Sequence, residues 1–341
     1  MSVRKIFTIL LLIFIALTVV IVLVARPYYR IVTQKMSVSP FATMLPWASA
    51  ESIDGKVTFL LLGIGGGAHD GPNLSDSISV LSYDTKTNQL RTLGVPRDVW
   101  SEPMQEKVNA AYAIGEAIEV GRGLTLAKAE ISSIVGIPIQ YAVVVDFGGF
   151  KKVIDYLDGV EVDVEVAFTD KEFPIAGREN DECGGDDPDY LCRYETISFK
   201  KGLQQMDGET ALKFVRSRHA SGGEGSDFAR SARQQLVVAA LRKKVLRFDM
   251  LSNPNALEGL YEVMNEVVVR DAPNQQVAYL ARTALLSKKD FSQESQALSE
   301  DLFEVPPAWQ YGRFVLIPKD GNTAAIKSFV RSYFGLEHIV K

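Results

Sequence analysis

Positive charge gathers in one stretch of the chain, RSRHASGGEGSDFARSARQQ, at residues 216–235. Four guanidinium groups flank its Gly-rich turn: Arg216, Arg218, Arg230 and Arg233. A guanidinium buried without an anion is costly, and the start of a helix offers free N–H groups and a positive dipole end. The stretch therefore predicts a site for phosphate groups. The alternative is a set of internal ion pairs with Asp227 or Glu224.

The segment that follows this turn has the pattern of an amphipathic helix. Val237, Leu241 and Val245 recur at helical spacing and predict a buried stripe. Counted back along the same face, the stripe continues through Gln234 and Arg230. One helix face is therefore expected to be apolar at its far end and cationic near its start.

A Gly-rich loop, LLGIGGGAHDGPNLSDSI, follows the first predicted strand. It lacks the glycine and lysine spacing of a dinucleotide-binding or P-loop site, and no helix pattern follows it. The loop contains Asp70 and leads to Asp76 at the start of the next strand. Two carboxylates beside a phosphate site predict a Mg²⁺ site, with Mn²⁺ as the alternative ion. The other interpretation of Asp76 is a turn or strand-start residue.

Further charged residues follow the third predicted strand. The segment GVPRDVW places Arg97 and Asp98 just beyond a strand end, where α/β folds build sites. Lys107 and Asn109 stand at a predicted helix entry, where ordinary helix-start polarity is the alternative explanation. No nucleophile is paired by spacing with a base, which argues against a Ser-His-Asp or Cys-His enzyme.

The N-terminus predicts a single membrane-spanning helix. Residues 7–25 carry no charge and are about as long as a bilayer-spanning helix requires. Cleavage after this segment, as in a signal peptide, is the minority alternative. Only six residues precede the span and a large segment follows it, so we expect residues 1–6 in the cytoplasm and the remainder outside. Residues 26–54 are expected to form a stalk, and residues 55–341 one extracytoplasmic domain.

Cys183 and Cys192 lie close together in a polar loop and are the only cysteines in the chain. In an extracytoplasmic domain such a pair predicts a disulfide, and two ligands alone make a poor zinc site. The net charge of −5 gives no general attraction to nucleic acid, so affinity for phosphate must be local.

Strand and helix patterns alternate along residues 55–341. Apolar runs predict strands at 57–62, 77–83, 89–95 and 141–145, an alternating pattern predicts a strand at 160–166, and residues 314–317 are strand-like. Helical patterns occupy 110–118, 124–135, 208–215, 228–247, 255–268, 274–287 and 326–333. The mixture predicts an α/β fold. Its architecture is a layered α-β-α sandwich with a central mixed, partly antiparallel sheet flanked by helices, plus the N-terminal transmembrane helix.

Six segments in this order resemble the LytR–CpsA–Psr family: TFLLLGIGG…SDSISVLS, GVPRDVW, KVNAAYAIGE, VVVDFGGFKKVIDYLDGVEVDV, DGETALKFVRSRH and SDFARSARQQ. They cover roughly residues 55–250, and residues 251–341 are expected to complete the same domain. The resemblance implies a membrane-anchored phosphotransferase. Such an enzyme moves a glycopolymer from a polyprenyl-pyrophosphate carrier to an envelope acceptor, generally peptidoglycan. It also implies a long apolar pocket for the polyprenyl chain.

The resemblance implies roles for individual residues. The pyrophosphate would be bound by Arg97, Lys107, Arg216, Arg218, Arg230 and Gln234. Asp76 matches a metal-binding aspartate of the family, whereas the family's second aspartate is replaced by Gly65, so Asp70 is the candidate substitute. Asp227 and Asp98 are the candidate carboxylates for the acceptor's proton. A hydrolase with water as acceptor, and a non-catalytic binder of lipid pyrophosphate, are the alternative functions.

Overall fold

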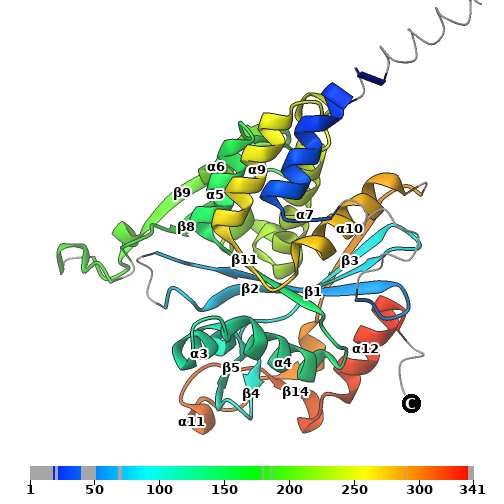
Figure 1. Ribbon diagram of the computed structural model, residues 1–341. Coiled ribbons are helices and arrows are strands. Elements are labelled where there is room, and N and C mark those ends of the chain that lie inside the picture. Colours follow the sequence, from blue (N-terminus) through cyan, green and yellow to red (C-terminus); the bar gives the residue numbers. More distant parts are fainter. Residues whose placement is uncertain are drawn as a thin grey trace, which may run out of the picture.

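The computed structural model describes residues 18–19, 22–39, 51–67, 71–178, 180–185, 187–287 and 289–336. Its centre is a six-stranded sheet in the order β11-β6-β1-β2-β3-β12 (Figure 1). The strands are β1 (Lys56–Ile64), β2 (Ser75–Asp84), β3 (Gln89–Gly94), β6 (Tyr141–Asp146), β11 (Val268–Arg270) and β12 (Ser292–Ala297). The β1–β2, β2–β3 and β6–β11 pairs are antiparallel, and the β1–β6 and β3–β12 pairs are parallel. The sheet is therefore mixed, as the sequence predicts.

Alternation along β1 assigns the two faces of the sheet. Leu60, Leu62 and Ile64 belong to a large core that continues through Val80 and Leu93 of the neighbouring strands. Successive strand side chains point to opposite faces, so the odd-numbered residues of β1 face the other layer. One face of the sheet therefore packs in this core, and the other face carries residues that line a cavity.

Helices cover both faces of the sheet (Figure 1). On the first side lie α3 (Ala111–Ile118), α4 (Gly123–Val135) and α12 (Ala324–Phe334), and buried residues of all three join the core under β1. On the second side lie α5 (Phe147–Tyr156), α6 (Gly208–Arg216), α7 (Asp227–Val245), α9 (Pro254–Val267) and α10 (Asn274–Leu286). Short helical turns are α8 (Phe248–Leu251) and α11 (Ala308–Tyr311).

The second layer has a core of its own, built by two small antiparallel sheets. One pairs β7 (Val160–Val164) with β10 (Gly202–Met206), and the other pairs β8 (Phe168–Pro174) with β9 (Tyr194–Phe199). Three rings pack between the second of these sheets and α6: Phe168, Phe199 and Phe214 have centroids 5.0–5.9 Å apart. Two further hairpins, β4 (Trp100–Ser101) with β5 (Glu106–Lys107) and β13 (Phe303–Glu304) with β14 (Ile317–Pro318), lie on the opposite side of the central sheet.

Residues 22–39, which include the start of the predicted stalk, pack against the second helical layer. Residues 22–30 are helical, a π-helical turn follows at Ile31–Lys35, and Figure 1 shows this blue helix alongside α9. Lys35 forms ion pairs with Glu258 at 2.9 Å and Glu262 at 2.6 Å. Among the residues that the structure describes, no helix is both long and apolar enough to cross a membrane. Residues 1–17, 20 and 21, which hold most of the predicted span, lie outside the described residues.

The observed elements confirm most of the expected ones, and the differences have physical reasons. The strand-like segment at 314–317 is confirmed only at its end: Leu316 forms an isolated parallel bridge with Val99, and β14 is Ile317–Pro318. Phe314 and Val315 lie outside the strand, and Val315 is buried. The segment at 160–166 forms β7, which belongs to a separate small sheet. Helix α5 was not predicted.

Candidate functional site

A cavity of about 550 Å³ lies between the central sheet and the second helical layer. Its floor is formed by the second face of the sheet, at Leu61 and Gly63 of β1 and Val145 of β6. Apolar side chains of three helices form the walls: Phe150 of α5, Leu212 and Val215 of α6, and Val237, Val238 and Leu241 of α7. The apolar stripe predicted for residues 237–245 thus faces this cavity at two of its three positions.

The polar end of the same cavity brings together charged residues that are far apart in the sequence. Its charged lining includes Asp76, Arg97, Arg216, Arg218 and Arg230, with the Gln234 amide beside them, and the acidic residues Asp146, Asp170 and Glu172 also line the cavity. The first six of these residues come from β2, from the segment after β3, from the end of α6 and from the first turns of α7. Four guanidinium groups beside an apolar chamber suit a ligand with phosphate groups and a long apolar tail.

Asp76 faces the cavity because of a bulge between β1 and β2. Gly63 pairs with Ser77, and the next residue, Ile64, pairs with Ser75, so Asp76 is the extra residue. A bulge of this kind redirects a side chain away from the regular pleat. The Asp76 carboxylate meets the Arg97 guanidinium at 2.6 Å, and both side chains are a little over one third exposed. Asp76 is therefore part of the charged cluster and not merely a strand-start residue.

Asp98 and Lys107 form a chain of ion pairs with Arg97 outside the cavity. Lys107 Nζ lies 2.7 Å from Asp98 Oδ1, and Arg97 Nε lies 3.6 Å from Asp98 Oδ2. Neither Asp98 nor Lys107 is among the described residues that line the cavity. Asp98 is held between two cations, an arrangement that orients Arg97 more directly than it would serve proton transfer.

The start of α7 positions Arg230 and Gln234. Ser226 caps the helix, with its Oγ accepting a hydrogen bond from the backbone N–H of Ala229 at 3.2 Å. This cap fixes the first turn, and its N–H groups and dipole add positive potential at the polar end. Arg216, at the end of α6, stacks on the ring of Phe147 with 4.0 Å between guanidinium carbon and ring centroid. The side chain of Asp227 is outside the described part of the structure, as is all of Asp70.

Arg233 has a structural role, which confirms the ion-pair interpretation for this one arginine. It is 2% exposed, and its Nη1 lies 3.1 Å from the Glu224 carboxylate. It also donates to the carbonyl oxygens of Phe214 at 2.9 Å and Ser217 at 2.6 Å. Arg233 thus ties α7 to the segment that carries Arg216 and Arg218.

Removing Arg233 should therefore destabilise the fold. We expect Arg233→Met to lower the free energy of unfolding by roughly 3 kcal/mol, because it leaves buried carbonyl groups and the Glu224 carboxylate without their donor. Thermal unfolding of the variant beside Arg233→Lys, which keeps the charge, measures this. A change below about 1 kcal/mol would contradict the role.

Asp170 is a buried carboxylate that the sequence analysis missed. It is 1% exposed, lines the cavity and receives the Ser217 hydroxyl at 2.7 Å. Burial raises the pKa of Asp170, but hydrogen bonds from Ser217 and from backbone N–H groups outweigh burial, so its pKa lies below the ordinary value. The backbone donors include Arg218 and His219, each at 3.2 Å. Asp170 of β8 therefore holds the backbone of residues 217–219 in place beside Arg216 and Arg218.

The lowered pKa gives a pH dependence of defined sign. Ionised Asp170 stabilises the fold above the ordinary carboxyl pKa of about 3.9, and this contribution is lost as the pH falls through the lowered folded-state pKa. We expect Asp170→Asn to lower the free energy of unfolding by about 1–3 kcal/mol at pH 7. The difference from the unsubstituted chain should shrink below about pH 4. Unfolding curves at both pH values test this, and a difference that stays constant would argue against it.

Asp146 is a second carboxylate that the sequence analysis did not single out. It ends β6, pairs with Ile64 across the parallel β1–β6 register, and lines the cavity. One of its oxygens, Oδ1, accepts from the Gly149 backbone N–H at 2.5 Å and caps α5. Ile64 immediately precedes Gly65, so Asp146 lies at the end of the strand that neighbours the Gly65–Gly67 loop.

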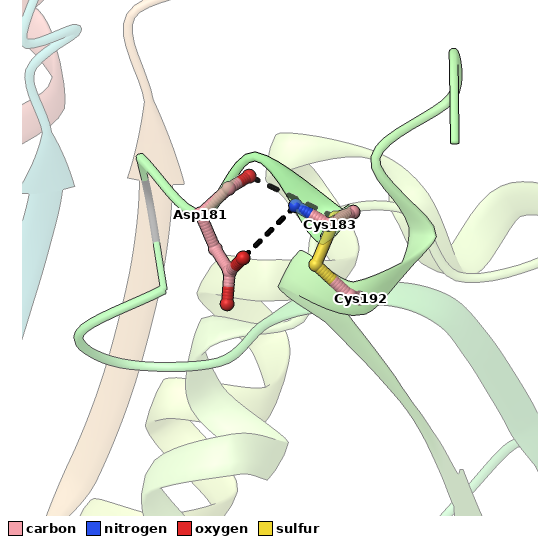
Figure 2. A group of neighbouring side chains, drawn as sticks. All are labelled: Asp181, Cys183 and Cys192. Carbon is pink, nitrogen blue, oxygen red and sulfur yellow. Dashed lines mark hydrogen bonds between the residues drawn. A yellow bond between two sulfur atoms is a disulfide. The ribbon is translucent and has the colours of Figure 1, made fainter. Parts of the chain in front are cut away.

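Cys183 and Cys192 are joined in a disulfide on the loop between β8 and β9, with an S–S distance of 1.98 Å (Figure 2). The Asp181 carboxylate lies beside them and accepts from the Cys183 backbone N–H at 2.9 Å. The three side chains have ligand atoms within 4.8 Å of one another. Disulfide sulfur is not thiolate, so this group does not make a metal site.

Two curated proteins match part of this chain. The "Regulatory protein MsrR" of Staphylococcus aureus (strain COL) is 32% identical over 200 residues, which are 57% of this chain and 51% of that protein. The "Polyisoprenyl-teichoic acid--peptidoglycan teichoic acid transferase TagU" of Bacillus mycoides is 30% identical over 201 residues, 58% of this chain and 55% of that protein. The chain thus spans about half the length of the curated relatives it matches.

Solved structures share the fold. B. subtilis TagV superposes with a TM-score of 0.55 and 25% identity, covering 83% of this chain and 99% of that one. A structure described as "TagT bound to LI-WTA" has a TM-score of 0.54 and 22% identity, with coverage of 84% and 95%. The model of the LytR_cpsA_psr family matches residues 32–305. Because this match covers most of the chain, the protein belongs to the LytR_cpsA_psr family.

Proposed function

We propose that this chain is a phosphotransferase that moves a glycopolymer from a polyprenyl-pyrophosphate carrier to a hydroxyl of an envelope acceptor. The observation that carries the proposal is a cavity that combines apolar walls with a cluster of arginines. The name of the relative TagU describes a transfer of teichoic acid to peptidoglycan, which makes peptidoglycan the first acceptor to test.

The cavity suits the two halves of such a carrier. The apolar walls from α5, α6 and α7 would contact the first isoprene units of the carrier. Moving the apolar surface of these units out of water and into an apolar pocket is favourable. Arg97, Arg216, Arg218 and Arg230 would bind the pyrophosphate through paired N–H groups, and the Gln234 amide would donate to it.

Transfer requires charge neutralisation and a positioned acceptor. The acceptor oxygen would form a bond to the phosphorus that carries the glycan, and the bond from that phosphorus to the bridging oxygen would break. Polyprenyl phosphate then leaves with the electron pair, and the guanidinium groups stabilise its charge. A carboxylate would take the acceptor's proton, and Asp227 at the start of α7 is the proposed base.

The donor set at the polar end fits a divalent cation. Asp76 and Asp146 both line the cavity, and carboxylate and phosphate oxygens are the ligands that Mg²⁺ prefers. These two residues would hold Mg²⁺, or Mn²⁺, where it would neutralise phosphate charge during transfer. The Asp76 carboxylate would then contact the cation with one oxygen and Arg97 with the other.

A membrane location follows from the proposed carrier. We propose that residues 7–25 anchor the chain, with residues 1–6 in the cytoplasm and the domain outside. Residues 22–39 pack on α9 through Lys35, and the Tyr28 hydroxyl donates to the Leu251 carbonyl oxygen at 3.1 Å. These contacts would hold the domain at a fixed distance from the bilayer that contains the carrier.

A transfer assay tests the proposal. The full-length chain in lipid nanodiscs would be mixed with a polyprenyl-pyrophosphate-linked glycan, peptidoglycan fragments and Mg²⁺. We expect labelled glycan on the peptidoglycan and release of polyprenyl phosphate. Phosphorylated glycan released into solution without attachment would instead show hydrolysis.

One observation favours a second candidate function, a non-catalytic binder of lipid pyrophosphate. Gly65 stands where the resemblance to the family places an aspartate, so one acidic group of the site is absent from its usual position. Tight carrier binding with no product in the same assay would support this candidate and contradict the transferase.

A further inference from the structure

A second pocket adjoins the main cavity and is also lined by Arg216. Its volume is about 340 Å³, within the usual range of about 300–1,000 Å³ for small-ligand sites. The residues that line both spaces are Asp146, Phe147, Phe173, Pro174, Leu212 and Arg216, so these side chains lie between the two spaces. A ligand in the second pocket would therefore contact the group that Arg216 holds.

The polar wall of the second pocket carries balanced charge. Lys151 of α5 and Lys213 of α6 face Glu209 of α6 and Glu195 of β9. Lys151 Nζ lies 3.0 Å from a Glu209 oxygen, and Lys213 Nζ lies 2.8 Å from a Glu195 oxygen. Two ammonium groups matched by two carboxylates leave no excess charge to attract a further polyanion. They do offer donors beside acceptors, which suits neighbouring hydroxyl groups because each hydroxyl both donates and accepts.

The remaining walls are apolar or bare. The rings of Phe147 and Phe173 supply a flat apolar face next to Arg216, 4.0 and 5.8 Å from its guanidinium carbon. The loop Gly65–Gly67 closes another side without side chains. Gly66 has φ +67°, and a Cβ there would come within 2.7 Å of the Asp146 side chain, so the loop lies directly against that carboxylate. Rings beside paired polar groups match the two aspects of a pyranose, apolar C–H faces and hydroxyl edges.

We propose that the second pocket binds an uncharged pyranose glycan next to the pyrophosphate, and that this glycan belongs to the acceptor. The inference rests on the proposed transferase function. In phosphoryl transfer the attacking and leaving oxygens lie roughly in line through phosphorus. The polyprenyl phosphate leaves toward the apolar cavity, so the acceptor hydroxyl must approach from the opposite side. The second pocket is a separate space that also borders Arg216, so a glycan bound there would lie beside the pyrophosphate. A sugar of the donor glycan has the same chemistry, so the experiment must distinguish it from a sugar of the acceptor.

Binding measurements with the full-length chain in nanodiscs separate these sources. Lys213→Met removes an ammonium from the pocket, and Ala176→Trp fills its exposed side without changing charge. Lys152→Met is the matched control, because Lys152 is paired with Glu266 outside the pocket at 2.5 Å. The probes are bare polyprenyl pyrophosphate, the same carrier with a disaccharide, and a peptide-free peptidoglycan glycan added to protein saturated with bare carrier.

We expect both pocket variants to bind the peptidoglycan glycan about tenfold more weakly than the control does, with bare-carrier affinity changed less than about twofold. If the variants lose affinity only for the disaccharide-bearing carrier, the pocket binds a glycan, but that glycan belongs to the donor. This result would overturn the assignment to the acceptor. Glycan affinities equal to the control in both variants would overturn the proposal. Failure of the unsubstituted chain to bind bare carrier would reject the proposed function itself, and the inference with it.

Discussion

Arg230→Ala is expected to reduce transfer at least 100-fold while the fold stays intact. The side chain lines the polar end of the cavity from the first turns of α7, where charge-assisted hydrogen bonds to phosphate would form. Removing one preorganised donor to developing charge costs about 10²–10³ in rate in other enzymes. Arg216→Ala should have an effect of the same size, since Arg216 borders both the main cavity and the second pocket.

A matched control is available on the same helix. Arg242 of α7 stacks on the ring of Phe291, with 4.1 Å between guanidinium carbon and centroid, and does not line the cavity. Arg242→Ala should leave transfer within about twofold of the unsubstituted chain. Arg230→Lys should recover only part of the rate, because an ammonium lacks the paired N–H geometry. Equal activity of Arg230→Ala and Arg242→Ala would remove Arg230 from the site.

Asp76→Asn is expected to weaken cation binding and transfer together. The bulge at Asp76 directs its carboxylate to Arg97 and to the proposed cation. Losing a carboxylate ligand should raise the dissociation constant for Mn²⁺ by at least about tenfold, as judged by electron paramagnetic resonance of the bound ion. Transfer at fixed Mg²⁺ should fall by about 100-fold.

The competing explanation is that Asp76 only orients Arg97. In that case Asp76→Asn combined with Arg97→Gln would be no less active than Arg97→Gln alone. Under the present account the double variant is less active, and Arg97→Gln by itself still binds Mn²⁺. Normal Mn²⁺ affinity in Asp76→Asn would contradict the role of Asp76 as a ligand.

Much of the fold follows from local sequence patterns. The apolar run in β1 and the helical period of α7 match the observed elements to within a few residues. Strand β12, SQESQA, could not be predicted, because its residues are polar and it gains its place only by parallel pairing with β3 at the sheet edge. Pairing of that kind depends on backbone groups of a distant segment, which no local pattern records.

The site was less predictable than the fold. The spacing along α7 placed Arg230 and Gln234 on the face of the apolar stripe, and both line the cavity with it. The same spacing could not identify Asp170, because its partners Ser217 and Arg218 lie 47 and 48 residues further along the chain. The position of Asp146 beside the Gly65 loop depends on the parallel register of β1 and β6, which is also a long-range feature.

Photo-crosslinking of a carrier tests the central claim, that one cavity holds the lipid tail beside the arginine cluster. The full-length chain in nanodiscs would be irradiated with a polyprenyl pyrophosphate that bears a diazirine on an early isoprene unit, and the labelled peptides mapped by mass spectrometry. The account predicts labelling of residues 235–245 of α7 at the positions of Val237, Val238 and Leu241, and loss of that labelling in Arg230→Ala but not in Arg242→Ala. Labelling that avoids α7, or that is unchanged in Arg230→Ala, would contradict it.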